Sequence, residues 1–340
     1  MGSRRDFLES LMLLTPGVML PWNIKDRMGN PTQDSDRWGP LLPKRKLGST
    51  GIEVSMLGVG GYHVGWTTEK DAQAVVEKAI QQGIRFFDSA YSYGDGQSER
   101  RYGKYLIPKY REDVFIMSKS TAPDYATARK ELEESLRRYG VDQLDLWQIH
   151  SLRSPEDTDS RIQNGVLRLA EEALKEGKAR YIGFTGHVSP YAHLRMIEQA
   201  GKSGLFSTLQ MPINLVDAAS EHSFVQLVIP KAVEAGLGLL AMKTLADGRF
   251  FGKKVMEEKT VWEAETPVIP TKFSVADAIH FSYSMPISTL ITGAENVAFL
   301  DEKVTLAKSY LTLEDKDRSQ IIESLIPDAN EGKIEYYKTA

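Results

Sequence analysis

The feature that most constrains the fold is an alternation of short apolar runs with helix-like segments, which begins near residue 44. The segments between the runs carry helix signals, such as Thr68 as a capping residue and Gly83 as a terminator. Eight strand–helix repeats predict a (β/α)8 barrel, the TIM-barrel fold. The eight runs are Val54–Val59, Ile84–Asp88, Val114–Lys119, Leu144–His150, Ala179–Thr185, Ser207–Met211, Leu237–Lys243 and Thr289–Thr292.

A doubly wound α/β sheet is the alternative for such a pattern. That fold normally carries Gly-x-Gly-x-x-Gly after its first strand, where a helix starts directly. The stretch Gly58-Val59-Gly60-Gly61 matches this only in part, and we expect no helix directly after it. The pattern therefore favours the barrel.

The chain divides into three parts in this interpretation. Residues 1–43 form an N-terminal extension of possible signal and linker, residues 44–326 form the barrel, and residues 327–340 form a polar tail that we expect to pack loosely. The barrel opens with a β-hairpin over Lys44–Ser55. The connection Ala246–Phe273 after the seventh strand is long and irregular, and loops at this end of a barrel commonly cover a site.

Composition excludes several classes of function. The net charge is −4, so no basic excess points to nucleic acid as the main partner. The sequence has no cysteine, which excludes disulfides and thiolate metal sites. No apolar run reaches the roughly 18 residues that a membrane span needs.

The first residues resemble a twin-arginine export signal, because Arg4 and Arg5 precede a mildly apolar stretch over Leu11–Leu20. Glu9 and the lack of a clear small-x-small cleavage site fit this poorly. An ordinary amphipathic segment is the alternative. A periplasmic protein delivered by the export machinery and a cytoplasmic protein both remain open.

Ionisable residues terminate three consecutive strands. Asp88, Lys119 and His150 are spaced 31 residues apart, and Tyr93 follows Asp88 by five residues. Since catalytic residues of a barrel gather where the strands end, we expect these four side chains at one mouth. Each of them alone has a simpler reading, as a helix cap, a surface charge, a loop packing residue or a core histidine.

Together the four residues predict a proton donor. Asp88 can pair with a buried Lys119, and the ammonium can lower the pKa of the Tyr93 phenol from its usual value near 10. A tuned acid beside His150 suits a reaction that develops negative charge on a carbonyl oxygen.

These residues resemble those of the aldo-keto reductase superfamily. The resemblance implies a (β/α)8 barrel and NAD(P)H-dependent reduction of a carbonyl, or the reverse alcohol oxidation. It implies Tyr93 as general acid, Lys119 and Asp88 as its tuning pair, and His150 as the group that orients the substrate. The matching segments are Arg45-Lys46-Leu47-Gly48 with Gly51, Leu57–Gly60, Asp88-Ser89-Ala90, Tyr93-Gly94, Ser98-Glu99, Lys119, Asp145-Leu146, His150, Gly177–Gly183, Gln210, Ile291–Ala294 and Leu300-Asp301-Glu302.

The residues that the resemblance implies for coenzyme binding depart from the usual pattern. Thr185-Gly186 stands for Ser-Asn, and Met242 stands for the aromatic that stacks on nicotinamide. Gly293 and Phe299 stand where some members use basic residues on a 2′-phosphate. We therefore expect NADP(H), with NAD(H) open. The full predicted set is Gly61, Tyr62, Asp88, Thr185, Gln210, Met242, Lys243, Thr244, Leu245, Gly293, Asn296, Glu302 and Lys303.

Aromatic residues near the predicted mouth suit a small carbonyl substrate with either a sugar face or an aryl group. The sequence does not identify the substrate or the oligomeric state. The predicted substrate contacts are Tyr62, His63, Trp66, Tyr91, His150 and Phe250.

Two other functions remain as alternatives. A metal-dependent barrel hydrolase could use Asp88, His150 and His187 as ligands, but that class calls for His-x-His after the first strand, where this chain has Tyr62-His63. We therefore predict no metal. A coenzyme-sensing barrel with little catalysis is the second alternative.

Overall fold

The computed structural model describes residues 34–200, 203–256, 259–310, 312–330 and 332–338. The predicted export segment lies outside these residues. Among the helices of the described ranges, none is both long and apolar enough to cross a membrane.

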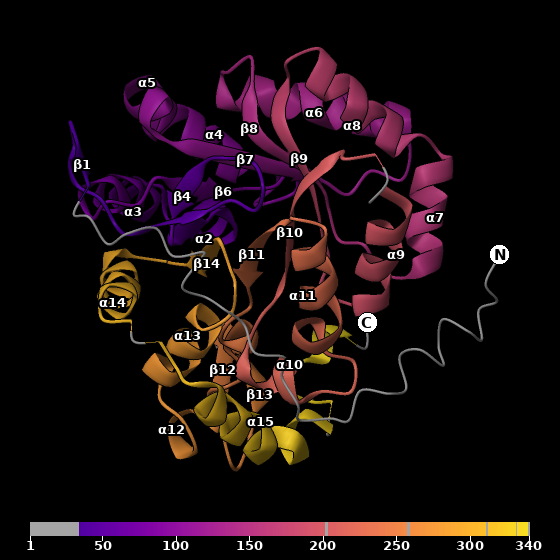
Figure 1. The fold of residues 1–340 in the computed structure, drawn as a ribbon. Coiled ribbons are helices and arrows are strands. Elements are labelled where there is room, and N and C mark those ends of the chain that lie inside the picture. Colours follow the sequence, from indigo (N-terminus) through magenta and orange to yellow (C-terminus); the bar gives the residue numbers. More distant parts are fainter. Residues whose placement is uncertain (1–33, 201–202, 257–258, 311, 331, 339–340) are drawn as a thin grey trace.

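Eight parallel strands close into a barrel (Figure 1). Strands that follow one another along the chain pair side by side, and the last strand pairs with the first to close the barrel. This confirms the predicted (β/α)8 fold. Because all strands are parallel, their carboxyl ends meet at one mouth. The strands are β5 Leu57–Gly60, β6 Phe86–Asp88, β7 Phe115–Ser120, β8 Leu144–Ile149, β9 Ala179–Thr185, β10 Phe206–Pro212, β11 Gly238–Met242 and β14 Thr289–Gly293.

The opposite end of the barrel is plugged by the predicted hairpin, which forms as β3 (Lys44–Lys46) and β4 (Glu53–Ser55). Leu47 and Val54 of this hairpin segment join the apolar layer inside the barrel. With this end closed, the carboxyl-end mouth is the place for chemistry.

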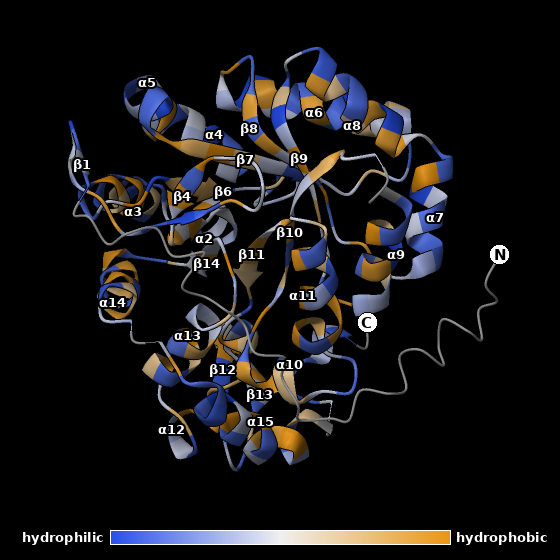
Figure 2. Cartoon of the chain, viewed as in Figure 1, coloured by the Kyte–Doolittle hydropathy of each residue, from blue (hydrophilic) through white to orange (hydrophobic). Residues whose placement is uncertain are grey.

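Helices surround the barrel, and one such as α3 packs on it with an apolar side formed by Ala72, Val75 and Ala79. In α3, Thr68 accepts a hydrogen bond from the Asp71 amide at the start, and Gly83 follows the end with a φ of 86°. Figure 2 shows hydrophobic and hydrophilic residues alternating along such helices. The helices are α2 Gly61–Trp66, α3 Glu69–Gln81, α4 Gln97–Tyr105, α5 Ile107–Tyr110, α6 Tyr125–Tyr139, α7 Pro155–Gln163, α8 Val166–Lys175, α9 Pro190–Ala200, α10 Leu215–Ala219, α11 Phe224–Glu234, α12 Val268–Thr271, α13 Val275–Tyr283, α14 Val297–Lys308 and α15 Asp315–Asn330. Short 3₁₀ turns lie at Arg111–Asp113, Ala246–Gly248 and Tyr336–Lys338.

Two local expectations differ from the structure. The helix α2 begins at Gly61 directly after β5, where we expected none. The connection after β11 is not simply irregular, because it contains an antiparallel hairpin of β12 (Lys253–Met256) and β13 (Lys259–Glu263). Neither element has the length or periodicity that marks a helix or strand in sequence.

Residues before the predicted boundary at 44 also belong to the packed body. A two-strand pair, β1 (Ser35–Asp36) and β2 (Gly39–Pro40), precedes the barrel. Arg85 binds the Asp36 carboxylate at 2.7 and 2.8 Å, and Leu42 is buried in the core. The described part of the predicted linker is therefore ordered against the barrel.

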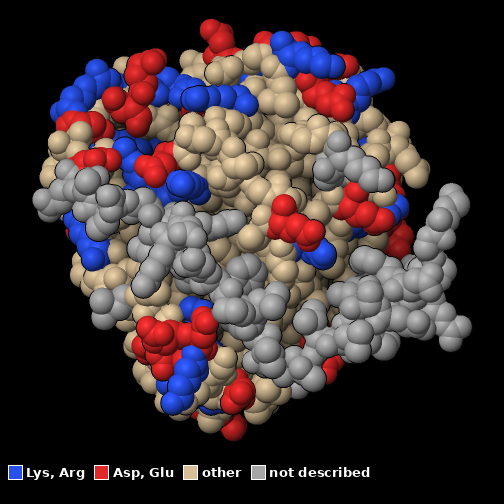
Figure 3. Space-filling model, viewed as in Figure 1, with Lys and Arg blue, Asp and Glu red and all other residues tan. Residues whose placement is uncertain are grey.

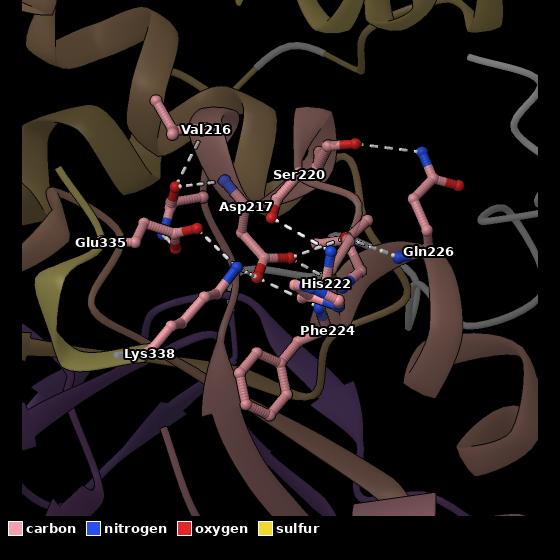
Figure 4. Close-up of polar contacts among 12 residues, drawn as sticks. Val216, Asp217, Ser220, His222, Phe224, Gln226, Glu335 and Lys338 are labelled. Atoms are coloured by element: carbon pink, nitrogen blue, oxygen red, sulfur yellow. Dashed lines mark hydrogen bonds and ion pairs between the residues drawn. The ribbon is translucent and has the colours of Figure 1, made fainter. Parts of the chain in front are cut away.

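The C-terminal tail is held by buried charges rather than packing loosely as expected. The Lys338 side chain points at the carboxylates of Asp217 and Glu335 (Figure 4). Its ammonium lies 2.6 Å from the first and 2.5 Å from the second. Asn214 donates to the Glu335 carboxylate at 3.0 Å, and Tyr337 is buried beside it. The polarity of the tail misled the prediction, because its polar groups find partners at the start of α10 (Leu215–Ala219), on Asn214 and Asp217.

Candidate active site

The structure brings the four predicted residues together at the carboxyl-end mouth. Asp88 ends β6, Lys119 lies near the end of β7, and His150 directly follows β8. Tyr93 lies in the loop between β6 and α4. The Tyr93 and His150 ring centroids are 5.9 Å apart, and the Lys119 Nζ lies 4.8 Å from the centroid of the Tyr93 ring.

Lys119 and Asp88 form a short ion pair inside the protein. The Lys119 Nζ lies 2.5 Å from Asp88 Oδ1 and donates to the Ser89 carbonyl at 2.6 Å. Burial lowers the pKa of Lys119 and raises that of Asp88, while each charge opposes the shift of the other. The Lys119 side chain is 0% exposed, so the carboxylate is what allows its charge to persist there.

The prediction that the pKa of Tyr93 lies below its usual value is wrong for this structure. Burial raises the pKa of the phenol well above its usual value, and Asp88 and Tyr62 add to the rise. The physical reason is that Asp88 neutralises the ammonium at close range, so burial dominates. The phenol therefore keeps its proton at neutral pH.

His150 is a neutral imidazole in this environment. Burial lowers its pKa well below the usual value, and the positive charges of Lys119 and Arg161 and the nearby His187 lower it further. Its Nδ1 is buried and has no hydrogen-bond partner among the described residues. A neutral ring still carries one N–H that can donate to a bound group.

Three buried polar atoms at the mouth fit the predicted coenzyme. They are Thr185 Oγ1 at the end of β9, Gln210 Oε1 in β10 and Thr244 Oγ1 after β11, and none has a partner within the described ranges. Because an unsatisfied buried polar atom is costly, these atoms are suited to the amide and phosphate groups of a nicotinamide coenzyme.

Other predicted coenzyme residues have structural roles of their own. Gly61 lies so close to β6 that an added Cβ would be 2.2 Å from the Asp88 carbonyl. Asn296 caps α14 by accepting from the Phe299 amide at 3.1 Å. Glu302 lies 2.5 Å from Lys303 and neutralises its ammonium.

The residues after β11 adopt an unusual backbone. Lys243 has a φ of 53°, a conformation uncommon for a residue with a side chain. Its ammonium lies 4.8 Å from the centroid of the Tyr337 ring, and burial lowers its pKa. Met242 and Leu245 on either side are half-buried, so this turn presents its side chains between the mouth and the C-terminal tail.

At position 293 the structure explains the missing basic residue. An added Cβ on Gly293 would lie 2.2 Å from His63 Nδ1. The imidazole of His63 therefore fills the space that a side chain there would need. It lies 3.7 Å from the Glu295 carboxylate.

Aromatic residues line one side of the mouth. Tyr62 meets the Tyr93 ring edge-on at a centroid distance of 5.6 Å, and Trp66 lies 6.3 Å beyond Tyr62. Both Tyr62 and Trp66 are more than half exposed. They form an accessible aromatic surface beside the phenol.

Phe250 does not fit its predicted role as a substrate contact. Its side chain is fully buried in the hydrophobic core. Its carbonyl accepts from the Ile269 amide at 2.8 Å, which folds this part of the connection inward. Sequence alone could not separate a loop aromatic that faces the mouth from one that anchors the loop.

The sequence analysis missed two tyrosines of the tail. Tyr337 meets the His187 ring at 5.9 Å, and the Tyr336 hydroxyl donates to Asp247 at 2.5 Å. The tail thus reaches the loops after β9 and β11. The signal that the sequence offered for a packed tail was this pair of adjacent tyrosines within a polar segment.

The metal alternative finds little support in the geometry. In the part of the chain that the structure describes, no group of three or more His, Cys, Asp or Glu side chains is arranged to hold a metal ion. Asp88, the first predicted ligand, forms an ion pair with Lys119.

On the face in Figure 3, acidic and basic side chains lie interspersed.

Comparison with known proteins places this chain in a family. A TM-score of 0.66 relates the fold to an aldo-keto reductase of Bacillus halodurans solved in its holo form, at 22% identity over 84% of this chain and 96% of that one. The aldo-keto reductase YhdN of Bacillus subtilis is 30% identical over 64% of this chain and 66% of its own length. The L-galactose dehydrogenase of Arabidopsis thaliana is 26% identical over 76% and 86%. The sequence profile of the Aldo/keto reductase family matches residues 56–310. This chain therefore belongs to the aldo/keto reductase family.

Proposed function

We propose that this protein reduces the carbonyl group of an aldehyde, ketone or sugar with NAD(P)H, or catalyses the reverse oxidation of an alcohol. The observation that carries the proposal is the single cluster of Tyr93, Lys119, Asp88 and His150, joined by the 2.5 Å ion pair. Membership of a family whose members in general are NAD(P)H-dependent reductases supports it.

Each residue of the cluster has a part in proton transfer. The Tyr93 hydroxyl holds a proton and gives it to the carbonyl oxygen as negative charge develops there. The Lys119 ammonium beside the ring stabilises the phenolate that remains, and Asp88 keeps this ammonium charged. Neutral His150 donates a hydrogen bond that orients the same oxygen.

The bound coenzyme supplies the hydride for the carbonyl carbon. Thr185 and Gln210 would hold its carboxamide end, and Thr244 with Lys243 would meet its phosphates, since these atoms lie unpartnered or positively charged at the mouth. We propose a modest preference for NADP(H), because Lys303 is already paired with Glu302.

Substrate class is proposed from the exposed aromatic surface of Tyr62 and Trp66. Such a surface can pack against a sugar face or an aryl group. The name of the plant relative, L-galactose dehydrogenase, supports including sugars.

The test is a panel of aldehydes, ketones and oxidised sugars, each followed by nicotinamide absorbance with NADPH and with NADH. The proposal expects turnover of at least one class of carbonyl. A protein that binds coenzyme but turns over none of the panel, in either direction, would contradict it and favour a coenzyme sensor.

A further inference from the structure

The loop that carries Tyr93 rests on a second buried ion pair, which the proposed chemistry does not use. Glu99, in the first turn of α4, is 0% exposed. Its carboxylate accepts from Ser118 at 2.5 Å and from Arg138 at 3.0 Å. Ser118 directly precedes Lys119 on β7, so this carboxylate joins the catalytic strand to α4 and α6.

Arg138 also contacts the loop itself. The nitrogen that binds Glu99 donates to the Tyr91 carbonyl at 2.8 Å, and the guanidinium carbon lies 4.2 Å from the centroid of the Tyr91 ring. On the other side of Tyr93, an added Cβ on Gly96 would lie 2.5 Å from the guanidinium. Arg138 therefore touches the loop both before and after the phenol.

We propose that Arg138 is a positioning residue, which holds the loop from Tyr91 to Gly96 so that the Tyr93 hydroxyl faces the reacting carbonyl. This inference rests on the proposed function. It assigns to a residue at the end of α6 a role in the proton transfer that Tyr93 performs.

The geometry requires arginine in particular. One planar guanidinium serves Tyr91, Glu99 and, through Nε at 3.0 Å, Glu134. A lysine ammonium can keep a charge opposite Glu99, but it cannot reach three acceptors in a plane or stack on a ring in the same way. The variant Arg138→Lys thus separates positioning of the loop from charge balance.

The neighbouring Arg137 offers a matched control. It lies on the same turn of α6, its side chain is 70% exposed, and it binds only Glu134 among the described residues. The experiment compares Arg138→Lys, Arg138→Met and Arg137→Met. Each is assayed for kcat, for coenzyme Kd by fluorescence, and for hydrogen exchange of the amides in residues 91–98.

A displaced catalytic group changes the chemical step rather than coenzyme binding. Displacement by about 1 Å can lower a rate by about a hundredfold. We therefore expect both Arg138 variants to lose about 10- to 100-fold in kcat, to keep the coenzyme Kd within about twofold, and to exchange the loop amides faster. With deuterated coenzyme, the isotope effect on kcat should rise, which a merely structural loss of active protein would not cause. Arg137→Met should match the wild type.

The inference is overturned if Arg138→Lys keeps kcat within about twofold of the wild type, or if Arg137→Met loses as much. If Arg138→Met does not fold, Arg138→Lys decides, because it retains the cation opposite Glu99. If the wild-type protein binds coenzyme but reduces no carbonyl, the proposed function fails. In that case unchanged amide exchange in Arg138→Lys would overturn this inference separately, and faster exchange confined to the loop would support it.

Discussion

Replacing Lys119 with methionine should destabilise the protein. A second substitution at Asp88 should restore the stability but not the activity. The substitution keeps the length of the side chain but leaves the Asp88 carboxylate buried without its 2.5 Å partner. Removing one member of a buried ion pair typically costs about 3–5 kcal/mol. That is a large part of the roughly 5–15 kcal/mol by which folded domains are stable.

The loss should depend on pH in a defined direction. Burial already raises the pKa of Asp88, and without Lys119 the largest opposing influence is gone. A carboxyl whose pKa is raised in the folded state does not reduce the free energy of unfolding below its pKa in the unfolded chain, which is near 4, because it is protonated in both states there. The destabilisation of Lys119→Met should therefore be small near that pH and should grow as the pH rises.

The measurement is urea unfolding followed by tryptophan fluorescence, for the wild type, Lys119→Met, and the double variant with Asp88→Asn. The double variant removes the unpaired buried charge of Asp88, so it should regain most of the stability that Lys119→Met loses. It should remain inactive, because the group that stabilises the Tyr93 phenolate is absent. Equal stability of the single and double variants at neutral pH would refute the account of the ion pair.

Three further predictions concern other parts of the chain. Burial lowers the pKa of the His193 imidazole to about 3, so the protein takes up a proton when it unfolds below about pH 6.5. Between about pH 7 and about pH 5, the wild type should therefore lose about 2 kcal/mol more stability than His193→Leu in urea titrations. Equal losses would contradict this. Lys338→Met leaves the Asp217 and Glu335 carboxylates facing each other, so limited proteolysis should cleave the tail faster, and unchanged cleavage would show that the ion pairs do not hold it. Lys303→Ala should lower kcat/KM for NADPH by less than about tenfold and leave NADH unchanged; a thousandfold loss would mean that this lysine selects the coenzyme.

The barrel and the location of the four central residues could be predicted because both follow from local patterns. Short apolar runs between helical segments define parallel strands, and the ends of parallel strands converge. Asp88, Lys119 and His150 each lie at such an end, so their spacing along the chain translated directly into proximity.

The remaining features depend on contacts between distant segments. The pKa of Tyr93 is raised because burial outweighs an ammonium that Asp88 already neutralises, and burial is not visible in a sequence. The tail is fixed by Lys338 reaching Asp217 across more than a hundred residues of chain. Phe250 faces the core rather than the mouth because the connection after β11 folds inward. Each outcome follows from tertiary packing, which local periodicity does not encode.

The most direct test of the account is the turnover of Tyr93→Phe at saturating coenzyme, measured together with its coenzyme Kd. Phenylalanine keeps the ring beside Lys119 and His150 and removes only the hydroxyl that holds the proton. Loss of a general acid typically lowers a rate by about a hundredfold or more, so we expect kcat to fall by at least that factor with the Kd unchanged. Undiminished turnover would show that the proton comes from another group and would contradict the central claim.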